Sequence, residues 1–207
     1  MNIALFDYGV GNLHSLGKAL EGGGARVSVT RDWDEALTSD ALVLPGVGAF
    51  SAAVEALPDN TEPIREALRG GLPCLGICLG MQILFERSDE GEGRGIGLIA
   101  GSVRRLESDI VPQMGWNDVE ATDDPLFDQL DGLVAYYANS FVCEPSDPSV
   151  VVARTRYGTD DLVAAVRVGH TWGVQFHPEK SSTPGRRLIQ NFLAAAEAAD
   201  RTAGGDR

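Results

Sequence analysis

Lysine is the residue that this sequence most nearly lacks. Only Lys18 and Lys180 are lysines among its 17 basic residues, and 30 acidic residues leave the chain with a net charge of −13. Such a field repels phosphate backbones, so nucleic acid is not an expected partner. An acidic composition with so little lysine suggests a salt-loving host. Stability and activity that are indifferent to molar salt would contradict that hypothesis.

Cysteine and long apolar runs are also scarce. Three cysteines do not make a disulfide framework, which favours a reducing cytoplasm. The sequence has no run of 18 apolar residues and begins without a basic segment, so it predicts neither a membrane span nor a cleaved signal peptide. We therefore expect a cytoplasmic protein with no membrane partner. Its length predicts a single domain, which we place over residues 1–200. We expect residues 201–207 to be a disordered tail.

The first ninety residues alternate between apolar strands and helical patterns. Strands are predicted at 3–6, 26–29, 41–45 and 73–77, and helices at 13–20, 49–57, 63–69 and 79–86. Further strands are predicted at 102–106, 116–120, 133–142, 150–156, 162–168 and 171–176, followed by a helix at 184–199. The order predicts an α/β fold with a central mixed, mostly parallel sheet flanked by helices, and an antiparallel β part in the C-terminal half.

A glycine loop follows the first predicted strand. Its sequence, GVGNLH, partly matches a dinucleotide-binding loop, and Asp32 stands near the distance expected for a ribose-binding acid. His14 occupies the place of the third glycine, however. We therefore interpret the loop as a plain turn between a strand and a helix.

Two cysteines stand four residues apart in the segment LPCLGICLGMQ. A zinc site built on Cys74 and Cys78 would need two further ligands. Cys143 and the three histidines form no ligand-like cluster in the sequence, so we expect no metal and no cofactor. Cys74 falls within an apolar strand, and Cys143 is likewise interpreted as a buried structural thiol.

Cys78 differs because it lies where a buried strand ends and a helix begins. The run G-I-C-L-G fits the turn that exposes a nucleophile at the edge of an α/β sheet, with glycines permitting close backbone packing. The N-terminus of the following helix favours a negative charge on the sulfur. A cysteine that merely fills a glycine-rich turn explains the motif equally well.

A nucleophilic thiol needs a base, and the sequence offers three histidines. His14 begins a helix and His170 lies in a turn, whereas His177 follows the last apolar strand. Residues two apart in an extended segment project to the same side, so Glu179 could hydrogen-bond one ring nitrogen and leave the other facing the sulfur. The alternative is a histidine in a turn beside a solvated glutamate.

Together these segments resemble a known family. PCLGICLGMQ and GVQFHPEKS are similar to the two signature segments of the class I, triad-type glutamine amidotransferases. DYGVGNLHSLGKAL, LPGVGAF, VPQMGWN and LIQNFL narrow the resemblance to the glutaminase subunits of imidazole glycerol phosphate synthase. The matching segments span residues 7 to 193.

The resemblance implies a mechanism. Cys78 would attack the side-chain amide of glutamine and form a thioester, releasing ammonia. His177 would act as acid and then base, and Glu179 would orient it. The backbone N–H groups of Leu79 and Val47 would form the oxyanion hole.

It also implies binding residues and a partner. The substrate would contact Gly46, Gly48, Gln82, Ser140 and Phe141. Ammonia would pass to a (β/α)8-barrel synthase subunit in a heterodimer that makes imidazole glycerol phosphate and aminoimidazole carboxamide ribotide in histidine biosynthesis.

At the interface with that subunit we expect Asn12 and Lys180. The sequence departs from the family at Gln113 and Asn139, where histidine is usual; neither belongs to the triad.

Three other functions remain open from the sequence. The chain could serve another amidotransferase, such as pyridoxal phosphate synthase. It could be a thiol hydrolase on a related fold, which would cleave peptides rather than glutamine. It could also be a binding module without catalysis, although the presence of Cys78, His177 and Glu179 argues against that.

Overall fold

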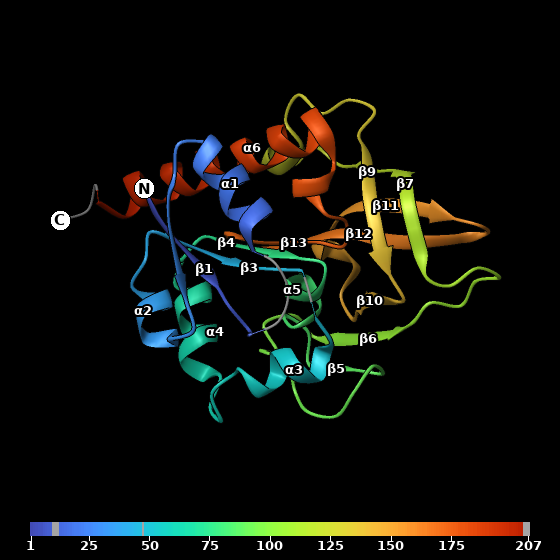
Figure 1. The fold of residues 1–207 in the computed structure, drawn as a ribbon, viewed down its shortest axis with the longest axis horizontal. Helices are drawn as coiled ribbons and strands as arrows, with labels where there is room; N and C mark the ends of the chain where they lie inside the picture. Colours follow the sequence, from blue (N-terminus) through green and yellow to red (C-terminus); the bar gives the residue numbers. More distant parts are fainter. Residues whose placement is uncertain (10–12, 47, 205–207) are drawn as a thin grey trace.

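The computed structural model describes residues 1–9, 13–46 and 48–204. Its centre is an eight-stranded sheet (Figure 1). In spatial order the strands are β2 (Arg26–Thr30), β1 (Asn2–Phe6), β3 (Ala41–Leu44), β4 (Cys74–Ile77), β13 (Thr171–Val174), β12 (Asp160–Val168), β11 (Val151–Tyr157) and β8 (Glu120–Ala121). The pairs from β2 to β13 are parallel and those from β13 to β8 are antiparallel, which confirms the predicted mixed sheet.

Helices cover both faces of the parallel part (Figure 1). The helices of one face are α1 (His14–Gly22) and α6 (Ser182–Gly204), and those of the other are α2 (Trp33–Leu37), α3 (Phe50–Glu55) and α4 (Glu62–Arg69). Strand alternation divides the core between the faces. In β1, Ile3 and Leu5 pack with the first group, whereas Ala4 and Phe6 pack with the second. Among the described residues, no helix combines the length and the apolar character that crossing a membrane requires.

Two small sheets flank the antiparallel end. One contains β10 (Phe141–Pro145), β6 (Gly101–Arg105) and β5 (Arg87–Ser88), and the other pairs β7 (Gln113–Asp118) with β9 (Val134–Asn139). Short 3₁₀ segments are η1 (Pro125–Phe127), η2 (Pro148–Val150) and η3 (Pro178–Lys180). In Figure 1 the β7–β9 pair stands at the end of the molecule opposite the N-terminus.

The helix that follows Cys78 is shorter than predicted. Instead of reaching residue 86, α5 spans Leu79–Gln82. The segment 95–99 takes over the carbonyl groups beyond it, since Ile96 N–H donates to Ile83 O (2.7 Å) and Ile99 N–H donates to Leu84 O (3.0 Å). These carbonyls are therefore unavailable to a continuing helix.

The predicted strand 133–142 was wrong as one element. It is broken at Ser140 into β9 and β10, which pair with β7 and β6 respectively. The carbonyl of Ser140 accepts a hydrogen bond from Leu106 N–H at 2.9 Å, which fixes the break. The break matters because it exposes the Ser140–Phe141 backbone beside Cys78, as described below.

Other differences are smaller. The predicted strand 116–120 is divided between β7 and β8, and α6 continues to Gly204, beyond the predicted end at residue 199. Helix α2 was not predicted. Its N-cap is Asp32, whose Oδ1 accepts hydrogen bonds from Asp34 N–H (2.8 Å) and Glu35 N–H (3.2 Å). Asp32 therefore caps a helix, as is usual for aspartate in this position.

Candidate active site

Cys78 occupies the turn between β4 and α5, at the carboxyl end of the parallel strands. Its φ of 47° and ψ of −103° lie in a sparsely populated region for a non-glycine residue, which costs on the order of 1–3 kcal/mol. Two glycines permit the turn. A Cβ on Gly76 would lie 2.5 Å from the Gly80 carbonyl oxygen, and one on Gly80 would lie 2.0 Å from the Leu44 carbonyl oxygen. Close packing of the backbone thus holds Cys78 in this conformation.

His177 lies beyond the end of the neighbouring strand, β13. Its backbone N–H donates to Tyr136 O at 2.8 Å, so β9 fixes its position. The Ser181 hydroxyl closes the arrangement: it donates to His177 O at 2.6 Å and accepts from Tyr136 N–H at 2.9 Å. The main chain of His177 is therefore held between β9 and the start of α6.

The side chain of His177 joins Cys78 to Glu179. The ring Nδ1 lies 2.9 Å from Glu179 Oε1, and the ring also hydrogen-bonds Cys78. Burial by itself lowers the pKa of His177, but the hydrogen bonds and charges of Cys78 and Glu179 outweigh burial and raise the pKa to about 9. The imidazole is therefore protonated at neutral pH and can pair with a thiolate.

A cavity of about 340 Å³ opens in front of Cys78. Its lining residues are Gly46, Gly48, Cys78, Leu79, Gln82, Glu90, Ala138, Asn139, Ser140, Phe141, His177 and Lys180. Gly46 is closest to the reacting groups, because a Cβ on it would lie 2.9 Å from Cys78 Cβ and 3.1 Å from His177 Cε1. The cavity thus combines a thiol, an imidazole and bare backbone in a space that fits an amino acid.

The structure brings most of the predicted residues together. Gly46, Gly48, Leu79, Gln82, Ser140, Phe141 and Lys180 all line the cavity with Cys78 and His177, and Glu179 contacts His177. Val47 and Asn12 lie outside the described residues. Gln82 Nε2 donates to Phe141 O at 3.3 Å, so the α5 helix and the Ser140 break are directly connected.

Two residues at the site were missed from the sequence. Gln175 is buried, and its Nε2 lies 3.4 Å from Cys78 Sγ. It stands two residues before His177, so the same alternation that pointed to Glu179 could have found it. Glu90 lines the cavity and its Oε2 accepts from Phe50 N–H at 2.9 Å. It lies in a loop, and no sequence pattern placed it there.

The two departures from the family are direct neighbours. Gln113 on β7 faces Asn139 on β9 in the strand register, and both are buried. Asn139 Nδ2 donates to Phe141 O at 3.2 Å, whereas neither amide atom of Gln113 has a hydrogen-bond partner within the described part of the chain. Asn139 thus contacts the cavity backbone, and Gln113 stands behind it.

The remaining cysteines are structural in their surroundings. Cys74 packs in the core cluster on the opposite face of the sheet from that containing Cys78, and Cys143 lies there too. All three thiols are free, and burial raises the pKa of Cys74 and of Cys143. Within residues 1–9, 13–46 and 48–204, no three histidine, cysteine or acidic residues gather as a metal site would require.

Comparison with known proteins places this arrangement in a family. Residues 4–196 match the glutamine amidotransferase class-I family. The imidazole glycerol phosphate synthase subunit HisH of Nostoc punctiforme is 46% identical over 201 residues, covering 93% of this chain and 95% of the relative. The subunit of the same name from Synechococcus elongatus is 42% identical over 205 residues, covering 95% of this chain and 94% of the relative.

A solved structure of a glutamine amidotransferase has the same fold, with a TM-score of 0.75 and 22% identity, covering 94% of this chain and 98% of the other. The fold that the chain shares with this structure agrees with the family that the sequence matches indicate. The chain belongs to the class-I glutamine amidotransferase family, among the HisH subunits of imidazole glycerol phosphate synthase.

Proposed function

We propose that this chain hydrolyses glutamine to glutamate and ammonia through a thioester on Cys78, and that it delivers the ammonia to a synthase subunit. The observation that carries the proposal is the contact between Cys78 and a protonated His177 that is itself paired with Glu179 at 2.9 Å. A nucleophile, a base and an orienting carboxylate are the parts that covalent acyl transfer needs.

In the first half of the reaction the Cys78 sulfur attacks the side-chain amide carbon of glutamine. The carbonyl oxygen becomes an oxyanion, which the Leu79 N–H at the start of α5 stabilises together with an N–H from the loop around Gly46 and Gly48, for which we propose Val47. His177 then donates its proton to the amide nitrogen. The C–N bond breaks, ammonia leaves, and a glutamyl thioester remains.

In the second half a water molecule attacks the thioester carbonyl. His177, neutral after the first half, takes the proton of the water, and the same donors hold the second oxyanion. The C–S bond breaks and glutamate leaves with Cys78 and His177 restored as the thiolate and imidazolium pair. Glu179 keeps Nδ1 of the ring protonated and turns the other nitrogen toward the sulfur throughout.

The other end of the substrate needs groups for an ammonium and a carboxylate. Glu90 is the acidic residue among the described lining of the cavity, so it suits the α-ammonium group. The Ser140–Phe141 backbone and Gln82 lie together through the hydrogen bond from Gln82 to Phe141 O, and they suit the remaining polar groups. This placement positions the side-chain amide of glutamine over Cys78.

The synthase subunit would dock on the outward side of β7 and β9. This docking face consists of Met114, Trp116, Val134, Tyr136 and Ala138. Met114 and Trp116 are 65% and 53% exposed, and the rings of Trp116 and Tyr136 meet edge to face at 5.9 Å. Large exposed aromatic and methionine side chains are typical of protein interfaces.

The docking face continues to the mouth of the cavity. Ala138 belongs to the docking face and also lines the cavity. Lys180 lines it too, and its Nζ lies 5.9 Å from the centroid of the Tyr136 ring. A partner seated on this face would therefore cover the opening and receive ammonia without releasing it to solvent.

The partner that fits best is the second subunit of imidazole glycerol phosphate synthase, a (β/α)8 barrel, in a heterodimer. There the ammonia would be used to form imidazole glycerol phosphate and aminoimidazole carboxamide ribotide in histidine biosynthesis. We place the complex in the cytoplasm, which the three free thiols support. Lys180 is proposed at the interface on the contacts described above; Asn12 is proposed from the resemblance.

Glutamate release from glutamine tests the activity directly. It should be measured for the chain by itself, with the synthase subunit, and with that subunit and its nucleotide ligand. We expect the largest rate when both are present. Absence of glutamate under every condition, with cleavage of casein-like peptides instead, would identify a thiol hydrolase and contradict the proposal. Growth of a strain that lacks this glutaminase should be restored by the chain.

The docking face is tested by a charge on its apolar surface. Met114→Lys should weaken association with the synthase subunit in a binding titration and should lower the stimulation of glutamate release. The matched control is Val29→Lys, because Val29 is a 56% exposed apolar residue on β2, the opposite edge strand of the main sheet. Equal affinity of the Met114 variant and the control would move the interface elsewhere.

A further inference from the structure

Gln175 is a buried polar residue of the site that has no role in the mechanism above, and it contacts the sulfur of Cys78. It follows β13 directly, is 1% exposed, and its backbone N–H is already satisfied by Ala164 O at 2.8 Å. Its side chain points at the nucleophile, with Nε2 at 3.4 Å from Cys78 Sγ. Burying a polar side chain at this depth costs free energy unless it is hydrogen-bonded, so its contacts identify what it does.

The hydrogen bonds around Gln175 determine which end of its amide faces the sulfur. The Phe141 carbonyl can only accept, so Gln82 must present Nε2 to it, at 3.3 Å. The same Nε2 carries a second hydrogen, which it donates to Gln175 Oε1 at 3.3 Å. With Oε1 used in this way, Nε2 of Gln175 is the group that faces Cys78. The sulfur therefore meets a donor and not an acceptor.

A donor at this position favours the charged form of the sulfur. Cys78 is buried, and a buried thiolate is stabilised by every hydrogen bond that it accepts. His177 supplies one partner, but it must leave the sulfur to protonate the departing nitrogen. The amide of Gln175 has no proton to lose in this range of pH, so it remains a donor through the whole cycle.

We propose that Gln175 is a further catalytic residue, which donates to the Cys78 thiolate and, through Gln82, connects it to the backbone at Phe141 where the substrate binds. The proposal rests on the role of Cys78 as the nucleophile. Gln82 is hydrogen-bonded both to Phe141 O and to Gln175. A substrate that moves the Gln82 amide therefore also changes the orientation of Gln175 and the environment of the sulfur.

The test follows alkylation of Cys78 by iodoacetamide as a function of pH, with mass spectrometry to assign the modified cysteine. Gln175→Leu should move the midpoint of the pH curve upward by about one unit, because a hydrogen bond to a charged group is lost, and should therefore lower the rate roughly tenfold at pH values below the midpoint. Gln175→Glu, which has the same shape, should lower the rate further through repulsion between a carboxylate and the thiolate.

Gln113→Leu is the matched control. Gln113 is an equally buried glutamine on β7, and its amide has no hydrogen-bond partner among the described residues. Its replacement should leave the midpoint where it is in the unaltered protein. Cys74 and Cys143, buried in the core, serve as internal controls for unfolding because they should stay unmodified unless the fold opens.

Gln82→Leu should cause a smaller upward shift of the midpoint, because Gln175 then lacks the hydrogen bond that fixes the orientation of its amide. An unchanged midpoint in Gln175→Leu, or an equal shift in Gln113→Leu, would overturn the proposal. If Gln175→Leu exposes Cys74 and thus fails to fold, the outcome for Gln175→Glu decides. Alkylation is measured without glutamine, so a chain that fails to hydrolyse glutamine can still support or overturn the role of Gln175.

Discussion

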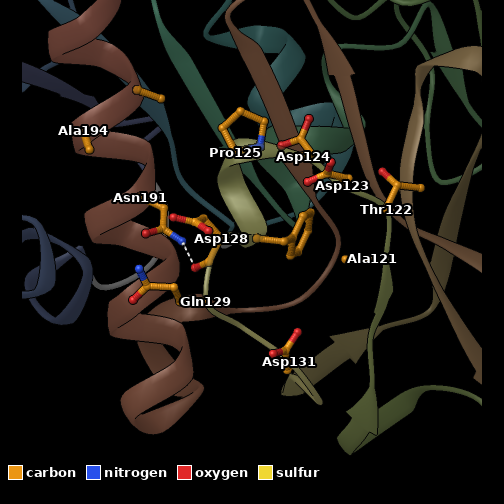
Figure 2. Close-up of a pocket in the computed structure, with 12 residues that line it drawn as sticks. Ala121, Thr122, Asp123, Asp124, Pro125, Asp128, Gln129, Asp131, Asn191 and Ala194 are labelled. Carbon is orange, nitrogen blue, oxygen red and sulfur yellow. Dashed lines mark hydrogen bonds between the residues drawn. The ribbon is translucent and has the colours of Figure 1, made fainter.

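Two cavities of this molecule differ in size and in chemistry, and the smaller one contains the reactive side chains. The cavity at Cys78 measures about 340 Å³, whereas a second cavity, between α6 and the segment that contains η1, measures about 840 Å³. Figure 2 shows the larger one, with Asn191 and Ala194 of α6 facing the segment from Ala121 to Asp131. Its lining includes the acidic residues Asp123, Asp124, Asp128 and Asp131.

Two polar residues of the larger cavity, Asp124 and Asn191, make structural hydrogen bonds. Asp124 is buried, and its carboxylate accepts from Trp172 Nε1 at 3.0 Å, from Arg167 at 3.0 Å and from Leu126 N–H at 2.9 Å. Asn191 Nδ2 donates to the carbonyls of Leu126 and Asp128, the second of which is drawn in Figure 2. These bonds fasten the η1 segment to the sheet and to α6.

The smaller cavity keeps its polar groups available. Asn139 Oδ1 and Glu179 Oε2 are buried without a hydrogen-bond partner in the described part of the chain, and Cys78 has a strained backbone. Unpaired polar atoms and strain lower stability, and folded proteins retain them at functional sites. The cavity that we propose as catalytic is therefore the smaller of the two, and it is the one lined by a strained cysteine and by a buried oxygen without a partner among the described residues.

Removal of the nucleophile should have the largest effect. Cys78→Ala should reduce glutamate release by about 10⁵- to 10⁶-fold, because the thioester cannot form. Asp128→Ala, which alters an exposed residue of the larger cavity, should leave the rate unchanged. The measurement is the initial rate of glutamate release with the synthase subunit present. Hydrolysis by the Cys78 variant within tenfold of the unaltered protein would contradict the mechanism.

Loss of the orienting carboxylate should come next. Glu179→Gln should lower kcat by about 10²- to 10⁴-fold, since the acid–base function of His177 depends on it. It should also shift the pH profile. His177 has its pKa raised to about 9 in part by Glu179, so activity that needs the imidazolium is lost above that pH, and in the variant this loss should move to lower pH.

The same shift affects stability. A folded pKa above the ordinary value of 6.5 means that the stabilisation is fully present below 6.5 and is lost as the pH rises through about 9. Urea unfolding should be measured at pH 6 and pH 9.5. The decrease in the free energy of unfolding between these two pH values should be smaller for Glu179→Gln than for the unaltered protein. If both proteins lost activity at the same alkaline pH, the role of Glu179 would be refuted.

A methyl group at Gly46 should have an intermediate effect. A Cβ there would lie 2.8 Å from Ile77 O and 2.9 Å from Cys78 Cβ, so the backbone must move. We expect Gly46→Ala to lower kcat/KM by roughly 10²-fold, the cost of misplacing reacting groups by a fraction of an ångström to one ångström. At Gly22, on the last turn of α1, a Cβ meets nothing within 4 Å, so Gly22→Ala should retain full activity. Equal activity of the two variants would remove Gly46 from the site.

The proximity of the three residues proposed as a triad could be predicted from the sequence because each of their signals is local. Glycine spacing marked the turn at Cys78, and a strand end followed by alternation marked His177 and Glu179. What brings them together is simple topology. Strands β4 and β13 are adjacent and parallel, with Ile77 opposite Val174, so the residues that follow them meet at one edge of the sheet.

The parts that could not be predicted depend on contacts between distant segments. Nothing in residues 133–142 signals the break at Ser140, because β9 and β10 are separated by their different partner strands. The early end of α5 likewise reflects the bonds to segment 95–99. Helix α2 did have a local signal, Asp32 followed three residues later by Glu35, which is typical of an N-terminal cap.

A substitution in the larger cavity should have the smallest effect on catalysis and a large effect on stability. Asp124→Ala removes an acceptor from Trp172 Nε1, which is buried and would then be unpaired, and it also removes the ion pair with Arg167 and the cap on Leu126. The free energy of unfolding should fall by about 2–4 kcal/mol, since leaving a buried donor unpaired costs about 1–3 kcal/mol and the lost ion pair adds to it.

Urea unfolding measures that change, and glutamate release measured well below the transition gives kcat for the folded protein. Asp123→Ala, at the exposed neighbouring position, is the control for removing one negative charge. We expect Asp124→Ala to lose stability while kcat stays within twofold of the control, because Asp124 contacts none of the residues that line the catalytic cavity through the bonds described above. A kcat that fell in proportion to stability would mean that the two cavities are coupled through β13. The larger cavity would then also contribute to function.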